Sequence, residues 1–246
     1  MAGSRRRLGL ITAAAVVVLA VVGFAGWWFV LRDDAPEEAN IGDAGETLDE
    51  VGGASGESAS GDGVEGDWTI DTSVGSFDDF SGTWAGYRVD EELEGIGATT
   101  AVGRTPDVTG TMTVEGDEVT AVDVEVDMTT LTSDSDLRDG QLAGRGLETD
   151  QFPTGTFSLT SPIPLPDGIE SGEQVSAEVA GDLTIHGVTK EVTLGFDVEL
   201  ADGTAVAVGS APIALTDFGI EPPTGMRVLS IGNDATFEFQ IFFTRA

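Results

Sequence analysis

Cysteine is absent from this 246-residue chain, and histidine, lysine and tyrosine occur once each. Without cysteine the chain has no disulfide bond, no thiol nucleophile, no thiolate zinc ligand and no site for a lipoprotein acyl group. His186 is the only imidazole that could serve a Ser-His-Asp mechanism. A zinc site would depend almost entirely on carboxylates, which zinc rarely accepts alone.

Basic residues are few. The chain has 11 Lys and Arg residues against 44 Asp and Glu residues, and its formal net charge at pH 7 is −33. Apart from Arg5–Arg7 the basic residues are scattered, whereas phosphate recognition needs clustered Lys and Arg. The composition therefore argues against nucleic-acid binding, and a surface this negative favours solubility and avoids anionic lipid head groups.

One long uncharged segment, LGLITAAAVVVLAVVGFAGWWFVL, occupies residues 8–31. As a helix it would be about 36 Å long, and a bilayer core of about 30 Å takes roughly 20 residues. Because Arg5–Arg7 precede it and acidic residues follow, the positive-inside rule leaves residues 1–7 in the cytoplasm. The segment predicts a single-pass anchor in the cell membrane with the remaining chain extracytoplasmic. A cleaved signal peptide is the alternative, but its hydrophobic region is usually shorter.

Residues 32–67 consist mainly of Asp, Glu, Gly, Ala and Ser, with few large apolar side chains. Such a segment buries too little apolar surface to offset the entropy lost on ordering, and its like charges extend it. We therefore predict an acidic disordered linker between the anchor and a folded domain at residues 68–246.

The hydrophobic pattern changes to a period of two residues after Trp68. Apolar and polar residues alternate in TAVDVEVDM (120–128), VTLGFDVEL (192–200) and TFEFQIFF (236–243). Further alternating runs occupy 84–89, 98–103, 108–115, 154–160, 174–185 and 204–215. Strict alternation is typical of antiparallel strands with one wet face. About eight such strands favour an all-β, closed, lipocalin-like barrel, because closure removes exposed sheet edges.

The one helix candidate in this region is SDSDLRDGQLAGRGLE, residues 133–148. Ser133 is the expected N-cap, and Asp134 and Asp136 would lie in the positively polarised first turn. Internal glycines weaken a helix, so the segment predicts a short broken helix or a long loop.

Several motifs resemble the YceI-like family. The most specific is GDLTIHGVTKEVTL (181–194), which is similar to the family's signature hairpin. Supporting motifs are TLTSDSDLRDGQL (130–142), LETDQFPTGTF (147–157), WTIDTS (68–73) and FGI (218–220). The resemblance implies an extracytoplasmic, lipocalin-like barrel of eight antiparallel strands, in which some members hold a polyisoprenoid or another long apolar molecule. Two features depart from the family pattern: the opening motif lacks a histidine, and residues 82–110 supply a second aromatic-containing start.

The inward apolar residues are the candidate pocket. Each methylene group that a ligand removes from water there contributes about 0.8 kcal/mol, so a long chain needs no specific polar contact. We expect a polyisoprenoid or other lipid ligand, with no cofactor and no metal. A structural or stress-response surface barrel with a filled core is the alternative. The predicted pocket residues are Val124, Val126, Phe157, Leu183, Ile185, Leu194, Phe196, Phe237 and Phe239.

A few rare polar residues are candidates for contacts with a ligand head group. These are Tyr87, Arg88 and Arg138, although pairing with surface carboxylates is the more common role for such arginines. The acidic runs DVEVD (123–127) and DSDLRDG (134–140) do not predict a metal site. The first belongs to a strand rather than a loop, and Arg138 stands where an EF-hand needs an oxygen ligand.

His186 follows the inward Ile185 and precedes Gly187, which predicts a position at the tip of a hairpin. The sequence shows neither a carboxylate partner for this imidazole nor a nucleophile motif, and catalysis needs both. A hydrolase that uses His186 is therefore the least favoured of the three functions, and we expect no enzyme. Lys190 is expected to face solvent on the following strand.

Overall fold

The computed structural model describes residues 35–54, 63–165, 167–222, 225 and 228–246, with backbone only for 51–54. The predicted cytoplasmic segment 1–7 and the predicted transmembrane segment 8–31 lie outside the described residues. Among the helices in the described ranges, none combines the length and the apolar character needed to span a bilayer.

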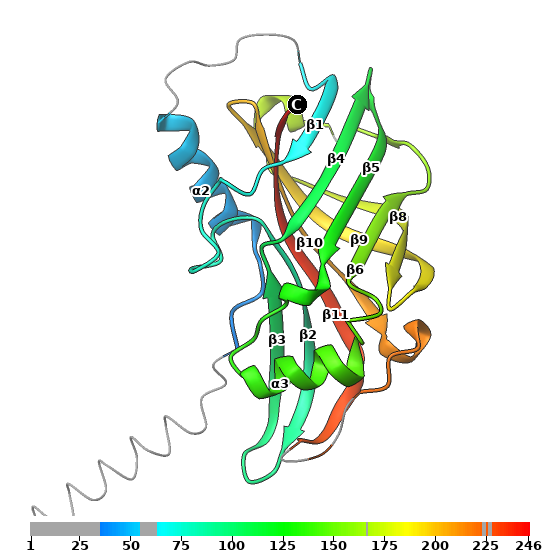
Figure 1. Cartoon of the computed structure of the whole chain (residues 1–246). Helices are drawn as coiled ribbons and strands as arrows, with labels where there is room; N and C mark the ends of the chain where they lie inside the picture. Colours follow the sequence, from blue (N-terminus) through cyan, green and yellow to red (C-terminus); the bar gives the residue numbers. More distant parts are fainter. Residues whose placement is uncertain (1–34, 55–62, 166, 223–224, 226–227) are drawn as a thin grey trace, which may run out of the picture.

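Eight antiparallel strands form a closed ring (Figure 1). Around the ring the order is β1-β4-β5-β6-β8-β9-β10-β11, and β11 pairs with β1 through Trp68 and Arg245. The predicted eight-stranded antiparallel barrel is confirmed. The bounds are β1 (Gly66–Ile70), β4 (Val108–Glu115), β5 (Glu118–Asp127), β6 (Thr154–Leu159), β8 (Val175–Ile185), β9 (Val188–Ala201), β10 (Thr204–Ala214) and β11 (Val228–Arg245).

A hairpin extends the barrel wall beside β11. It consists of β2 (Trp84–Leu93) and β3 (Gly97–Thr105), and β2 pairs with the first part of β11, whereas β1 pairs with the end of β11. The second aromatic-containing start in the sequence is therefore this hairpin. A two-residue strand, β7 (Ile163–Pro164), pairs with β5 outside the ring.

The turn between β8 and β9 contains two residues in the left-handed region. His186 has φ of 52° and Gly187 has φ of 72°. A type I′ turn needs positive φ at both central positions, and its twist matches the twist of the flanking strands. The prediction that His186 lies at the tip of a hairpin is confirmed.

One short helix packs near the end of the barrel where β2 and β3 project (Figure 1). It is α3 (Asp136–Gln141), continued by a single π turn, η2 (Leu142–Gly146), so the predicted broken helix is confirmed. Its N-cap is Ser135, whose hydroxyl accepts from the Arg138 amide at 3.4 Å; the prediction of Ser133 is wrong. The Ser133 hydroxyl lies 2.6 Å from an Asp139 carboxylate oxygen instead. Three 3₁₀ turns also occur: η1 (Met128–Thr130), η3 (Ile169–Ser171) and η4 (Leu215–Phe218).

A second helix, α2 (Ile41–Ala54), lies within the segment predicted to be disordered, so that prediction is wrong for these residues. The helix packs against the outer side of β9 and β10. Ala44 and Leu48, each 1% exposed, contact apolar side chains that point out of the barrel: Val206, Val208 and Phe242. Apolar burial therefore stabilises this helix although it contains few large apolar residues.

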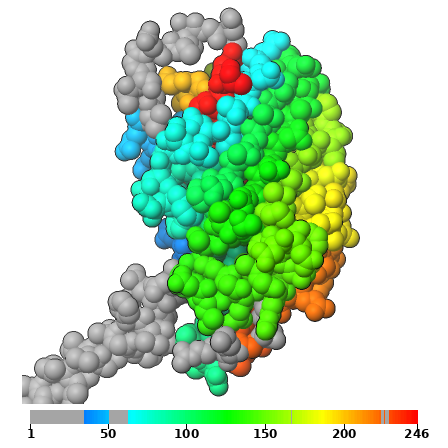
Figure 2. All heavy atoms as spheres, viewed as in Figure 1, coloured from blue at the N-terminus to red at the C-terminus, as the bar shows by residue number. Residues whose placement is uncertain are grey.

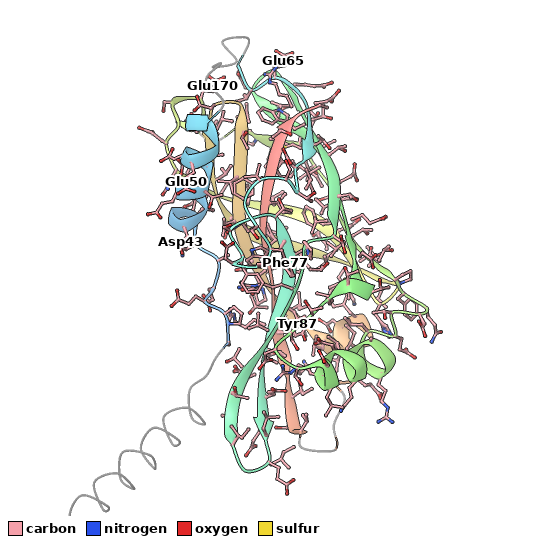
Figure 3. The ribbon with its side chains drawn as sticks, turned by 60° about the vertical axis from the view of Figure 1, so that its left-hand side comes forward. Asp43, Glu50, Glu65, Phe77, Tyr87 and Glu170 are labelled. Atoms are coloured by element: carbon pink, nitrogen blue, oxygen red, sulfur yellow. The ribbon has the colours of Figure 1, made fainter. Side chains whose placement is uncertain are left out.

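The acidic side chains of α2 lie on its other side. Asp43 and Glu50 are exposed and point away from the barrel (Figure 3). The Asn40 side chain accepts a hydrogen bond from the Asp43 amide at 2.9 Å, which caps the first turn. The helix thus keeps its charges in water while one narrow apolar stripe docks on the sheet.

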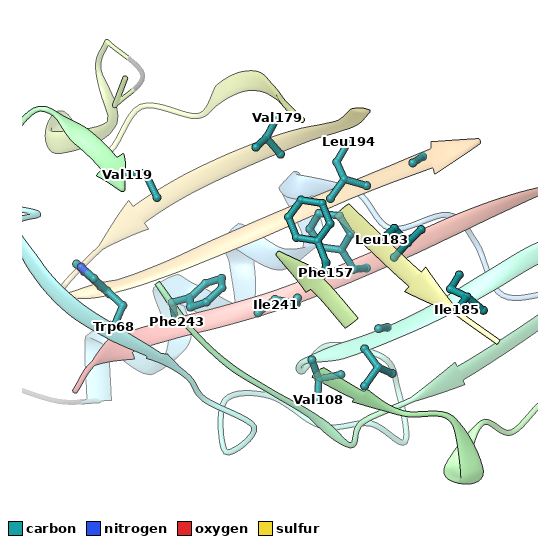
Figure 4. Close-up of a cluster of buried hydrophobic side chains, with 14 of the residues drawn as sticks. Trp68, Val108, Val119, Phe157, Val179, Leu183, Ile185, Leu194, Ile241 and Phe243 are labelled. Carbon is teal, nitrogen blue, oxygen red and sulfur yellow. The ribbon is translucent and has the colours of Figure 1, made fainter. Parts of the chain in front are cut away.

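The apolar core occupies the inside of the barrel. Trp68, Leu183, Leu194, Ile241 and Phe243 are buried and converge on the interior from different strands (Figure 4). In the space-filling view, atoms of the segments drawn in green cover the middle of one barrel face (Figure 2). The alternation of the sequence thus places one row of each strand in a shared interior.

Candidate apolar ligand site

The described residues of the barrel and its β2–β3 hairpin enclose two cavities. The larger has a volume of about 390 Å³ and extends toward α3 and the β2–β3 hairpin. The smaller has a volume of about 160 Å³ and is lined by residues at the β1 end, including Val64, Trp68 and Phe243. Small-molecule sites in proteins usually measure about 300–1,000 Å³, so the larger cavity can accommodate a ligand.

The two cavities adjoin each other, since five residues line both. The Phe157 ring reaches from β6 into the interior toward Leu194 (Figure 4). It lies directly over Gly181 of β8, where an added Cβ atom would be 2.2 Å from Phe157 Cζ. A rotation of such a ring would alter the separation between the cavities. The shared residues are Ala85, Val124, Val126, Phe157 and Phe237.

All nine predicted pocket residues lie on these walls. Their participation in ligand binding stays a prediction. The larger cavity is lined by Val124, Val126, Phe157, Leu183, Ile185 and Phe237. The smaller is lined by Val124, Val126, Phe157, Phe237 and, in addition, Leu194, Phe196 and Phe239.

Sequence reasoning missed one wall of the larger cavity, which the β2–β3 hairpin, β10, β11 and η4 provide. These side chains form a small apolar cluster of their own. The signal in the sequence was the alternation of inward residues along β2, but acidic residues interrupt its apolar character. The missed residues are Val89, Ala101, Ile213, Leu215, Ile231 and Ala235.

Polar side chains gather in the wall of the larger cavity near α3. Arg138 Nη2 donates to Glu91 Oε1 at 2.5 Å, and Arg138 Nη1 pairs with Asp134. Burial opposes the charge of Arg138, but the hydrogen bonds that it donates to Glu91 and Asp134 raise its pKa above the ordinary value. Burial raises the pKa of Tyr87 well above its ordinary value, so this phenol is neutral at physiological pH.

The three residues predicted to contact a ligand head group lie on opposite faces of the sheet that forms the cavity wall. Tyr87 and Arg138 line the larger cavity. Arg88 lies on the outer side, where its Nε is 3.5 Å from Glu238 Oε2 and its Nη2 donates to the Pro36 carbonyl at 2.7 Å. The prediction for Arg88 is wrong because consecutive residues of a strand point to opposite faces. Glu91 was missed, although it shares the inward side of β2 with Tyr87.

His186 joins neighbouring loops and does not line either cavity. Its Nε2 lies 3.0 Å from Glu148 Oε2, its Nδ1 lies 3.2 Å from the Phe218 carbonyl, and the Phe152 ring packs edge-on at 4.5 Å. The expectation that the imidazole lacks a carboxylate partner is therefore wrong. Both ring nitrogens are therefore engaged in contacts between loops.

The acidic residues on the strands pair locally. Asp123 of β5 accepts from the Ser158 hydroxyl at 2.8 Å. Within the described ranges, no three acidic or histidine side chains cluster closely enough to hold a metal ion.

Comparisons with known proteins find relatives of the barrel. A UPF0312 protein of Pseudomonas syringae pv. tomato is 28% identical over 159 residues, which cover 61% of this chain and 79% of the relative. A UPF0312 protein of Pseudomonas paraeruginosa is 31% identical over 160 residues, which cover 57% of this chain and 79% of the relative.

Solved structures share the fold at low sequence identity. A polyisoprenoid binding domain from Saccharophagus degradans, implicated in plant cell wall breakdown, superposes with a TM-score of 0.55 at 15% identity and covers 73% of this chain and 98% of that domain. BcnA of Burkholderia cenocepacia superposes with a TM-score of 0.53 at 16% identity, and the match covers 70% of this chain and 98% of BcnA. The family model of the YceI-like domain matches residues 64–243, from just before β1 almost to the end of β11. The chain therefore belongs to the YceI-like family.

Proposed function

We propose that this protein binds a long apolar molecule, a polyisoprenoid or another lipid, inside the barrel. The observation that carries the proposal is the apolar cavity of about 390 Å³, which adjoins a second cavity of about 160 Å³. Burial alone provides affinity, since each methylene group removed from water contributes about 0.8 kcal/mol. The description of the Saccharophagus degradans neighbour as a polyisoprenoid binding domain supports this ligand class.

The ligand would enter near α3. Ile96, in the turn of the β2–β3 hairpin, and Leu137, on α3, both line the larger cavity, yet they are 45% and 54% exposed. Exposed apolar side chains at a cavity rim are typical of ligand-binding grooves. A lipid tail would contact these residues first and then pass inward between the hairpin and α3.

The proposed cellular setting is a single-pass membrane anchor at residues 8–31 with the barrel outside the cytoplasm. The length of the uncharged segment and the arginines that precede it support this orientation. An anchored barrel would stay close to a bilayer that contains lipid ligands. Protease added to spheroplasts, whose outer layers have been removed, would digest the barrel if this orientation is right and leave it intact if the barrel is cytoplasmic.

A structural barrel with a filled core is the rival function. It requires an interior packed at the usual density of protein cores, with few voids larger than a water molecule. The two cavities argue against such packing. No catalytic step is part of the proposal.

Ala85 provides the test, because it lines both cavities and is 1% exposed. Ala85→Phe would place a ring in the space a ligand needs. We expect this variant to bind the fluorescent apolar probe N-phenyl-1-naphthylamine at least about tenfold more weakly than the unmodified chain, a loss of about 1.4 kcal/mol. Ala98→Phe is the matched control, since Ala98 of β3 is exposed and lines neither cavity. Undiminished probe binding by a folded Ala85→Phe variant would contradict the proposal.

A further inference from the structure

Glu91 is a buried carboxylate in the wall of an otherwise apolar cavity. The residue is 4% exposed, and its Oε1 accepts from Arg138 Nη2 at 2.5 Å. Its Oε2 is buried and has no hydrogen-bond partner among the described residues. A buried charged oxygen without a donor is costly, because it has lost its hydration and gained nothing in return. The cavity therefore contains a strong acceptor that lacks a donor.

The charges around Glu91 define what that donor can be. Arg138 is the cation in contact with Glu91, and it also pairs with Asp134. The carboxylates of Asp134 and Asp139 both lie close enough to the neutral Tyr87 phenol to affect its ionisation. The cluster of Tyr87, Glu91 and Arg138 thus has no excess positive charge for an anion, and an anionic group beside Glu91 Oε2 would meet like-charge repulsion.

We infer that Glu91 Oε2 accepts a hydrogen bond from the head group of the bound lipid. The cavity would then select a long apolar chain that ends in a neutral hydroxyl group over the same chain ending in phosphate or lacking a donor. This inference rests on the proposed lipid-binding function and names the head-group chemistry of its ligand.

The expected selectivity follows from the acceptor being a carboxylate oxygen whose partner oxygen already pairs with Arg138. Hydrogen bonds to charged groups are stronger than those between neutral groups, and a site that bonds a ligand hydroxyl rejects the analogue without it. A hydroxyl-terminated chain should therefore be bound at least about tenfold more tightly than its methyl ether.

The experiment offers the full-length chain, in lipid nanodiscs, an equimolar mixture of geranylgeraniol, its methyl ether and its monophosphate. Native mass spectrometry then measures the ratio of the three bound molecules. Each variant receives the same mixture, so the three probes partition into the bilayer in the same way for every variant. A difference in the ratio between two variants therefore reports a difference in binding. The unmodified chain should bind the alcohol at least about tenfold over both competitors.

Glu91→Leu should lose the preference for the alcohol over the ether, and Glu92→Leu should retain it. Glu92 is the matched control because it is the next residue of β2 and is exposed on the outer side. Glu91→Gln keeps the size of the side chain but replaces the charged acceptor by a weaker neutral one, so its preference should fall between the two. If Glu91→Leu does not fold, the alcohol-to-ether ratio of Glu91→Gln tests the inference in its place.

Equal binding of alcohol and ether, a preference for the monophosphate, or an undiminished alcohol preference in folded Glu91 variants would overturn the inference while leaving lipid binding in place. If no chain binds, the proposed function fails as well.

Discussion

At the scale of single residues, His186 connects loops that come from distant parts of the sequence. Its ring contacts Glu148 before β6 and the carbonyl of Phe218 after β10, while its backbone forms the β8–β9 turn. The only histidine of the chain thus connects loops at one end of the barrel and lines neither cavity.

His186→Ala should lower the free energy of unfolding by about 1–3 kcal/mol, measured by chemical denaturation. The variant loses the two hydrogen bonds of the imidazole ring. It also places alanine at a φ of 52°, a left-handed conformation that alanine adopts only at a cost in free energy. His186→Asn should cost less, because asparagine tolerates this conformation. Uptake of the apolar probe should be unchanged in both, and its loss in a folded variant would show that His186 belongs to the ligand site.

Where strands alternate strictly between apolar and acidic positions, the sequence correctly indicated which residues face the interior, and their contact with a ligand stays a prediction. It failed at Arg88 and Glu91, because assigning a face requires knowing the phase of β2, and its short apolar pattern left that phase open. The unpaired state of Glu91 Oε2 depends on where α3 places Arg138, which involves a contact across 47 positions. No local pattern contains that information.

At the scale of elements, the close approach of β6 and β8 depends on Gly181. The Phe157 ring occupies the space where a side chain at this position would lie, and the Ser158 carbonyl would be 2.8 Å from an added Cβ atom. Because this ring also lines both cavities, Gly181 affects the shape of the interior as well as the strand packing.

Gly181→Ala should therefore lower the free energy of unfolding by about 1–3 kcal/mol, the usual cost of overpacking. The displaced ring should also weaken binding of the apolar probe. Gly140→Ala in α3 is the matched control, since an added Cβ atom there meets nothing within 4 Å. It should raise the free energy of unfolding by up to about 1 kcal/mol, because alanine is the better helix former. Equal effects of the two substitutions in thermal or chemical denaturation would contradict this account.

The docking of α2 depends chiefly on Leu48. We expect Leu48→Ala to lower the free energy of unfolding by about 2 kcal/mol, which is near the lower limit for Leu→Ala substitutions in protein cores. The effect is small because a short helix can detach from the sheet before the barrel itself unfolds. Amide hydrogen exchange should accelerate throughout α2. Glu46→Ala, at an exposed position of the same helix, should leave exchange unchanged. If Leu48→Ala does not accelerate exchange in α2, the helix is held by other contacts.

Sequence composition could not predict α2, because its stability comes from the sheet beneath it. The relevant signal lies in β10, where Ala205 and Ala207 line the smaller cavity while Val206 and Val208 are buried on the opposite side. A strand that is apolar on both faces must be covered on both faces, and here α2 provides the outer cover.

At the scale of the whole molecule, the period-two pattern predicted the barrel, but the identity of its strands required the structure. The ring contains β1, which has no long alternating run, and leaves outside it β2 and β3, which do alternate. The first part of β11 pairs with β2 and its end pairs with β1, and the position of this change of partner determines which strands close the ring. The cavities also lay beyond sequence reasoning, since their volume depends on how side chains from eight strands fill a shared interior.

The central claim is that the barrel holds an apolar molecule, and the most direct test is to look for that molecule. The full-length chain, purified from the cells that produce it, would be measured by native mass spectrometry and its bound material extracted with organic solvent. We predict a mass above that of the chain and an apolar compound in the extract, in an amount approaching one molecule per chain. A chain that carries no such compound, and that takes up neither lipid nor a fluorescent apolar probe, would contradict the account.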